Sequence, residues 1–180
     1  MSAATFMNNP NYVEYVRLLR QLHRLIAEGN DGDEGDALRD DMDAPWYALS
    51  EEEIARIRGL SADLYTLDDA PAAPTHQKSA AAKALGAEIQ RAWEARDWEG
   101  VLDLLRRSPG VWPPHSEAFL RGWSWNQLGD PDTADLFFQR AAELAPHDTK
   151  PSVAVVVAQS RAGHVEEADR YAQAILAPAA

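Results

Sequence analysis

The residues of this chain that could do chemistry are mostly carboxylates, and their densest run is DGDEGDALRDDMD, which begins at Asp31. In the frame of an EF-hand loop starting at Asp31, the sixth position should be Gly but is Asp36. The twelfth position should be Glu but is Met42. We therefore interpret residues 31–43 as a solvated acidic loop and not as a calcium site.

Other reactive residues are also not spaced for catalysis. The chain has five histidines, none in an H-E-x-x-H pattern or another close metal-binding spacing, and it has no cysteine to serve as nucleophile or zinc ligand. A Gly-rich phosphate loop and a nucleophile elbow are both missing from the sequence. We expect no enzymatic activity, no metal and no cofactor. A carboxylate-based hydrolase is the weakest alternative.

Composition excludes further classes of function. The 180 residues carry a net charge of −12, whereas a nucleic-acid-binding protein usually shows a basic stripe. Hydrophobic residues make up 46% of the chain, but no long apolar run predicts membrane insertion. The N-terminus lacks the basic and apolar regions of a signal peptide, and together with the absence of cysteine this leads us to expect a cytoplasmic protein.

These side chains lie in segments whose apolar residues recur at helical spacing, and the first such segment is near the N-terminus. Asn11 is a candidate N-cap, with Glu14 reaching back to it, and Gly29 is the expected stop. The apolar residues between them recur at helical spacing: Tyr12, Tyr15, Val16, Leu19, Leu22 and Ile26.

Two more helices are expected before a linker. A short helix is predicted around Asp36 to Met42, and Pro45 is expected to begin the next segment. Ser50 and Glu53 form a capping box for a third helix, whose apolar face is Ile54, Ile57, Leu64 and Tyr65. We expect an N-terminal three-helix module at residues 9–67 and an extended linker at residues 68–78.

After the linker the sequence repeats. Its clearest unit contains Gly122, Trp125, Gly129, Ala134, Phe138, Ala141 and Pro146. This spacing resembles the tetratricopeptide repeat, a pair of antiparallel helices with a period of about 34 residues. One period later Gly163 and Ala168 return, and one period earlier Ala95 and Gly100 take the same places. The resemblance implies an all-α protein whose residues 79–180 form a short α-solenoid of three helix pairs.

The resemblance also implies a binding groove. Trp123 and Trp125 point about 200° apart on a helix, so they cannot share one face. Trp125 falls on a core position of the family, and Trp123 falls on a position that lines the concave groove. By the same correspondence the groove is lined by Leu85, Ile89, Trp93, Phe119, Trp123, Asn126, Gln127, Lys150, Val153, Val157 and Arg161.

The function we expect is therefore binding without catalysis, by an adaptor or scaffold that holds a helical or extended apolar peptide. An alternative is a chaperone of secreted or membrane-active clients, because type III secretion chaperones are similar: small, acidic and built from three repeats. The N-terminal module resembles modules of small bacterial repeat proteins only faintly, and its amphipathic helix could itself fill the groove. The last helix should expose Tyr171, Ile175 and Leu176, where a second copy could make a homodimer.

Overall fold

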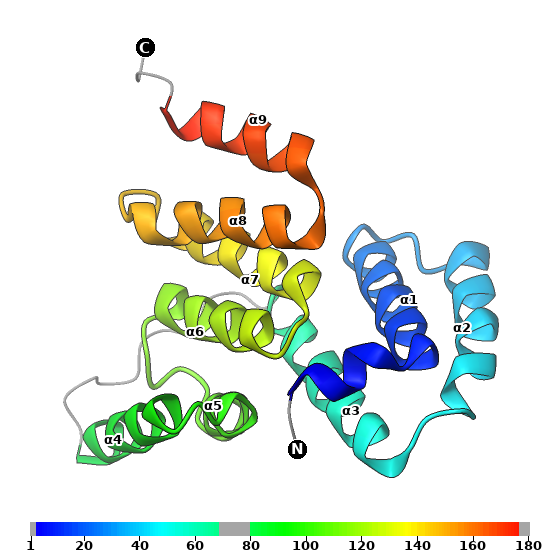
Figure 1. Ribbon diagram of the computed structural model, residues 1–180, viewed down its shortest axis with the longest axis horizontal. Helices are drawn as coiled ribbons and strands as arrows, with labels where there is room; N and C mark the ends of the chain where they lie inside the picture. The colour runs from blue at the N-terminus through cyan, green and yellow to red at the C-terminus, as the bar shows by residue number, and fades with distance from the viewer. Residues whose placement is uncertain (1–2, 69–79, 177–180) are drawn as a thin grey trace. The chain divides into compact units, whose positions relative to one another are not determined.

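The computed structural model describes residues 3–68 and 80–176, which are almost entirely helical (Figure 1). The chain forms two compact units, residues 1–70 and 71–180. The predicted linker, residues 68–78, lies outside the described residues except for Asp68. The all-α fold class is confirmed. Within the described residues, no helix combines the length and the hydropathy needed to cross a membrane.

The first unit consists of a 3-10 helix η1 (Ala3–Asn8) and three α-helices, α1 (Pro10–Ala27), α2 (Asp33–Trp46) and α3 (Glu51–Tyr65). Helix α1 packs against both α2 and α3. The three helices bury apolar side chains at helical spacing, among them Tyr12, Val16, Met42, Ile57, Leu60 and Leu64. Tyr65, which we predicted on the buried face, is 55% exposed. Leu60, which we did not predict there, is fully buried.

The starts of α1 and α3 are joined by one carboxylate. The predicted Asn11 cap is wrong, because Pro10 occupies the first turn and Asn9 caps the helix by accepting from the Asn11 backbone N–H at 3.0 Å. The Asn9 amide also donates to Glu53 Oε1 at 2.7 Å. Glu53 Oε2 accepts from the Ser50 backbone N–H at 2.8 Å, which confirms the capping box. Burial acts to raise the pKa of Glu53, but these hydrogen bonds outweigh it and lower the pKa.

The short helix predicted around Asp36 to Met42 is confirmed, but it is longer than expected, because α2 runs from Asp33 to Trp46 and replaces most of the predicted acidic loop. Asp33, Glu34 and Asp36 lie in the first turn of α2, where negative charge is favourable near the exposed backbone N–H groups. Arg39 pairs with Asp31 and with Asp36. The prediction that Pro45 begins a new segment is wrong, because Pro45 is buried within the last turn of α2.

The second unit contains α4 (Ala80–Glu94), α5 (Trp98–Arg107), α6 (Pro114–Gln127), α7 (Pro131–Leu144), α8 (Thr149–Ala162) and α9 (Val165–Leu176). Each helix packs against the next one along the chain, as the run from green to red in Figure 1 shows. Helices that are consecutive in the sequence are therefore also neighbours in this unit.

Helices α6 and α7 lie close together at Gly122. A Cβ atom on Gly122 would lie 2.7 Å from Cδ1 of Phe138 and 3.1 Å from the carbonyl oxygen of Ala134. Trp125, Ala134 and Phe138 are each at most 1% exposed. The predicted burial of these core residues is confirmed.

The turns show that the first helix pair is shifted by one residue from the predicted period. Gly129 and Gly163 both have φ of 87°, and the residue with positive φ in the first pair is Arg96, at 57°, and not Ala95. Asp97 and Asp130 then cap α5 and α7 in the same way. Val101, and not the predicted Gly100, is the counterpart of the fully buried Ala134.

We predict that Gly122→Ala destabilises the second unit, although alanine favours a helix by about 1 kcal/mol. The added methyl group would overlap the Phe138 ring, so we expect a net loss of about 1–3 kcal/mol in unfolding free energy. Gly86→Ala in α4 is the matched control, because its Cβ would lie 3.4 Å from Trp112 Cζ2, an ordinary contact. Chemical denaturation measures both. Equal effects of the two variants would contradict the close approach.

Candidate functional site

An aromatic run crosses the second unit and contains Trp98, Trp93, Trp123, Phe119 and Phe138. Trp93 of α4 stacks on Trp123 of α6 with ring centroids 5.6 Å apart and planes 28° apart. Trp98, at the start of α5, meets the edge of Trp93 at 5.1 Å. Phe119 continues the run, 6.2 Å from Trp123 and 5.5 Å from Phe138. Three of the residues predicted to line the groove, Trp93, Phe119 and Trp123, are thus brought together.

The two tryptophans of α6 differ in burial. Trp125 is 1% exposed, whereas Trp123 is half-buried within the aromatic run. The sequence did not predict Trp98 as a member of this run. Its signal was its place directly after the turn residue Asp97, which puts the indole at the first residue of α5, beside the end of α4.

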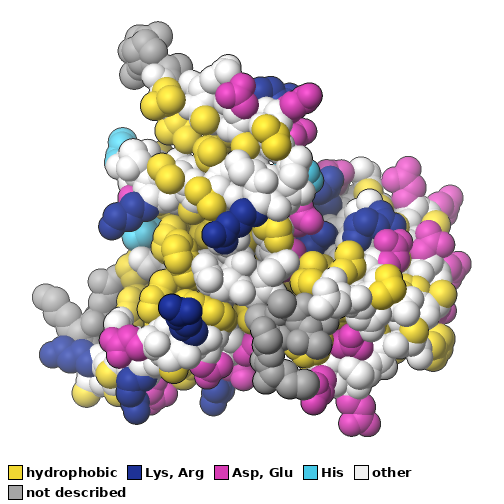
Figure 2. All heavy atoms as spheres, viewed as in Figure 1, with side chains coloured by type: hydrophobic (Ala, Val, Ile, Leu, Met, Phe, Trp, Pro, Cys, Tyr) yellow, Lys and Arg dark blue, Asp and Glu magenta, His cyan; other side chains and the backbone are white. Residues whose placement is uncertain are grey.

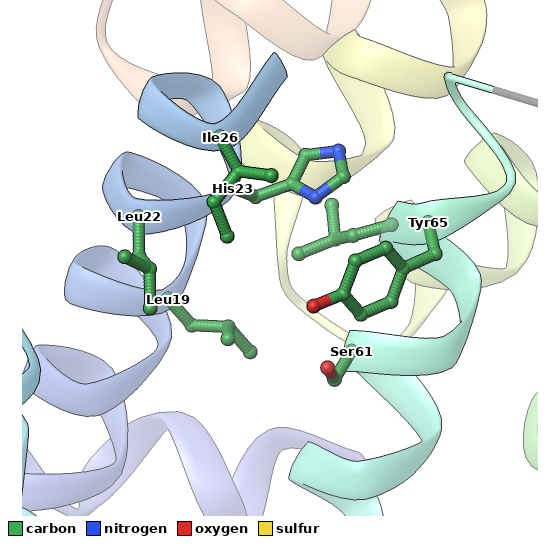
Figure 3. Close-up of a pocket in the computed structure, with 7 residues that line it drawn as sticks. Leu19, Leu22, His23, Ile26, Ser61 and Tyr65 are labelled. Carbon is green, nitrogen blue, oxygen red and sulfur yellow. The ribbon is translucent and has the colours of Figure 1, made fainter. Parts of the chain in front are cut away.

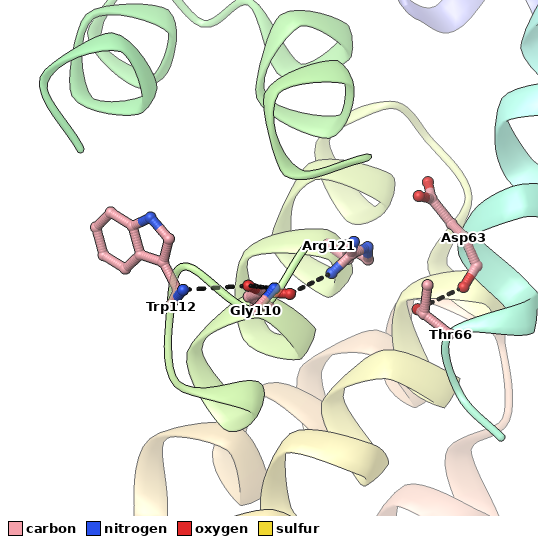
Figure 4. A network of polar contacts seen from close by, with 6 residues as sticks. Asp63, Thr66, Gly110, Trp112 and Arg121 are labelled. Carbon is pink, nitrogen blue, oxygen red and sulfur yellow. Dashed lines mark hydrogen bonds and ion pairs between the residues drawn. The ribbon is translucent and has the colours of Figure 1, made fainter. Parts of the chain in front are cut away.

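A buried carboxylate holds the loop between α5 and α6 (Figure 4). Glu117 Oε1 accepts from the backbone N–H groups of Gly110 and Trp112 at 3.0 and 3.2 Å, and its Oε2 lies 3.5 Å from Arg121 Nη1. The Trp112 ring packs against Gly86 of α4 and against the core shared by α4 and α5. Glu117 therefore positions the loop whose tryptophan fixes α4, which carries Trp93.

Two predicted groove residues of α4 belong to the interior. Ile89 is 4% exposed and forms a core cluster with Val101 and Leu105 of α5. Leu85 is partly buried against the same cluster. The one-residue shift in the first helix pair explains this placement, because Ile89 then corresponds to the buried Gly122 and not to Trp123.

At the end of α6, Asn126 and Gln127 are the predicted polar members of the groove. Gln127 is half-buried. Asn126 is 9% exposed, and its Oδ1 is buried without a hydrogen-bond partner among the described residues. An amide in that state can accept a hydrogen bond without first losing one.

The predicted groove residues of α8 are all exposed. Val153 is 58% exposed and Val157 is 43% exposed. Lys150 and Arg161 lie near the two ends of the same helix and are exposed as well. Figure 2 shows hydrophobic side chains gathered over α6, α8 and α9 on one face, with Lys and Arg side chains between them.

A polar contact holds α8 against α7. Asp135 Oδ2 accepts from Gln139 Nε2 at 2.9 Å and from Gln159 Nε2 at 3.2 Å. Burial raises the pKa of Asp135, and the two amides oppose this only partly. This contact fixes the face of α8 that turns inward, so the valines at 153 and 157 face outward.

The histidines and acids that the structure describes can be compared with the geometry of a metal site. No group of three or more His, Asp or Glu residues among them could hold a metal ion. His23 lies beside a hollow of about 20 Å³ between α1 and α3, lined also by Leu19, Leu22 and Tyr65 (Figure 3). Its Nε2 is 3.1 Å from Asp68 Oδ2. The hollow has room for about one water molecule.

We predict that Asp135→Asn stabilises the protein at neutral pH. The variant keeps an oxygen for the two glutamines and removes a carboxylate whose burial disfavours its charge. Because the pKa of Asp135 is raised in the folded state, wild type takes up a proton on folding as pH falls and regains stability, whereas the variant does not titrate. The advantage of the variant, measured by urea denaturation, should therefore shrink between pH 7 and about pH 4. An advantage that grows towards acid would contradict the raised pKa.

No protein-family model, no curated protein and no solved structure matches the chain.

Proposed function

We propose that residues 79–180 form a tetratricopeptide-like α-solenoid that binds a protein partner without catalysis, by holding an apolar helix or extended peptide. The observation that carries this proposal is the exposure of two valines, Val153 and Val157, on one face of α8. Apolar side chains grouped on one face of a helix mark interaction sites more often than scattered ones do.

The packing of the second unit supports the solenoid part of the proposal. Consecutive helices contact each other in sequence order. The small residues that the repeat requires, Gly122, Ala134 and Ala141, are buried where α6 meets α7. Left-handed glycines occur at the turns after α6 and α8, as the repeat pattern predicts. A scaffold of this kind offers a rigid surface and leaves specificity to the side chains on it.

The aromatic run on α6 is a second, rigid part of the proposed surface. Trp123 is held between Trp93 and Phe119 by ring contacts, so its orientation costs little additional entropy when a partner binds. Half-buried tryptophans are frequent hot spots in protein interfaces. We therefore place the centre of the binding surface on α6 and α8.

The proposal predicts that Val153→Ser combined with Val157→Ser weakens peptide binding at least about tenfold. Peptides would be selected from a random display library on the wild-type chain, and their dissociation constants measured by fluorescence anisotropy. Both valines are exposed, so the unfolding free energy should stay within about 0.5 kcal/mol of wild type.

Val165→Ser is the matched control, because Val165 is 66% exposed but lies at the start of α9. It should leave the dissociation constants unchanged. Selected peptides that bind the double variant as tightly as wild type would refute the proposed surface.

A further inference from the structure

The charge of α8 is opposite to that of the whole chain. Thr149–Ala162 contains no Asp or Glu, and its only charged residues are Lys150 and Arg161, in a chain whose net charge is −12. Both cations share one face of the helix with Ala154 and Val157, because these four positions follow each other at i, i+4, i+7 and i+11. We call this face, with Val153 beside it, the α8 stripe.

The cations of the second unit fall into two groups within the described residues, those with an ion pair and those without one, such as Lys83, Lys150 and Arg161. Arg106, Arg140 and Arg170 each pair with an acid three residues away on their own helix. Lys150 and Arg161 form no ion pair with any residue that the structure describes. Both are exposed, so their charges face solvent at the two ends of the valines.

The position of Lys150 does not serve helix stability. A cation in the first turn of a helix lies near backbone N–H groups that carry partial positive charge, which is unfavourable. Arg161, in the last turn, lies where a cation is favourable. Helix stability therefore accounts for Arg161 and opposes Lys150.

We infer that the α8 stripe receives an acidic amphipathic helix, with carboxylates near both ends of an apolar ridge. This inference rests on the proposed function and names the chemistry of the partner. Lys150 and Arg161 are separated by about 16 Å along the axis of α8, so the partner's carboxylates should be about eleven residues apart. The valines between them are short and branched, which allows two helices to approach closely.

A helix fits this stripe better than an extended peptide does. An extended peptide must find partners for its backbone N–H and C=O groups, whereas a helix satisfies them internally. Between Lys150 and Arg161 the hydroxyl of Ser160 already donates to the carbonyl oxygen of Val156 at 2.8 Å. The apolar members of the stripe, Val153, Ala154 and Val157, have no polar side-chain atoms.

The net charge of the chain does not override these local charges. At physiological ionic strength, exposed charges are screened over about 8 Å, so distant acids act weakly on a docked helix. Lys150 and Arg161 would meet the partner's carboxylates at contact distance. Pairs of this kind at the rim of an interface set partner choice and association rate more than total affinity.

The test uses the full chain and two synthetic amphipathic helical peptides with the same leucine ridge. One peptide carries glutamates about eleven residues apart at the ends of the ridge, and the other carries lysines at those positions. Dissociation constants are measured by anisotropy at low and high ionic strength. We expect the glutamate peptide to bind wild type about tenfold more tightly, and salt to remove the difference.

The variant Lys150→Glu with Arg161→Glu should invert this preference. Lys83→Glu with Arg24→Glu changes the net charge equally at exposed positions on α4 and α1, and it should leave the preference as in wild type. Circular dichroism checks that each variant is folded.

The outcomes separate this inference from the proposed function. If both peptides bind equally, or the lysine peptide binds more tightly, and the double valine variant still loses binding, the acidic partner is wrong and the proposed surface stands. If neither peptide binds wild type and library selection also gives no binder, both fail. A dimer in light scattering that the charge reversal abolishes would identify a second copy as the occupant and overturn the acidic partner.

Discussion

The contact of Phe138 with the backbone of α6 at Gly122 is the constraint on which the second unit depends. Without a Cβ atom at residue 122, the Phe138 ring lies directly against α6 and sets the rotation of that helix. Trp125 is then turned into the core, and Trp123, two residues earlier, is turned away from it. The same ring meets Phe119, so the aromatic run starts from the residue that fixes the helix pair.

Features that depend on the local backbone were predictable from the sequence. The capping box of Ser50 and Glu53 and the left-handed glycines at positions 29, 129 and 163 are present as expected. The burial of Gly122 was predicted because this glycine falls on a small-residue position of the tetratricopeptide pattern, where two helices approach closely. The all-α class followed from the same patterns.

Features that depend on competition between neighbours were not predictable. Asn9 and Asn11 are equally good caps in isolation, and Pro10 between them decided in favour of Asn9. The left-handed residue in the turn before α5 is Arg96. Glycine is the usual sign of this conformation, and none occupies this turn, so the predicted repeat was displaced by one residue. That error put Ile89 in the groove, where the structure shows it in the core of α4 and α5.

The α8 stripe could also be explained by solubility, since charges that flank a valine-rich segment discourage its aggregation. That role accepts a charge of either sign. In a chain of net charge −12, an acid at position 150 would add to the repulsion that keeps molecules apart and would also favour the start of α8. The chain instead places a lysine there, at the end of the helix where a cation is unfavourable. The sign of the charge, and not merely its presence, therefore favours recognition of an acidic surface as its role.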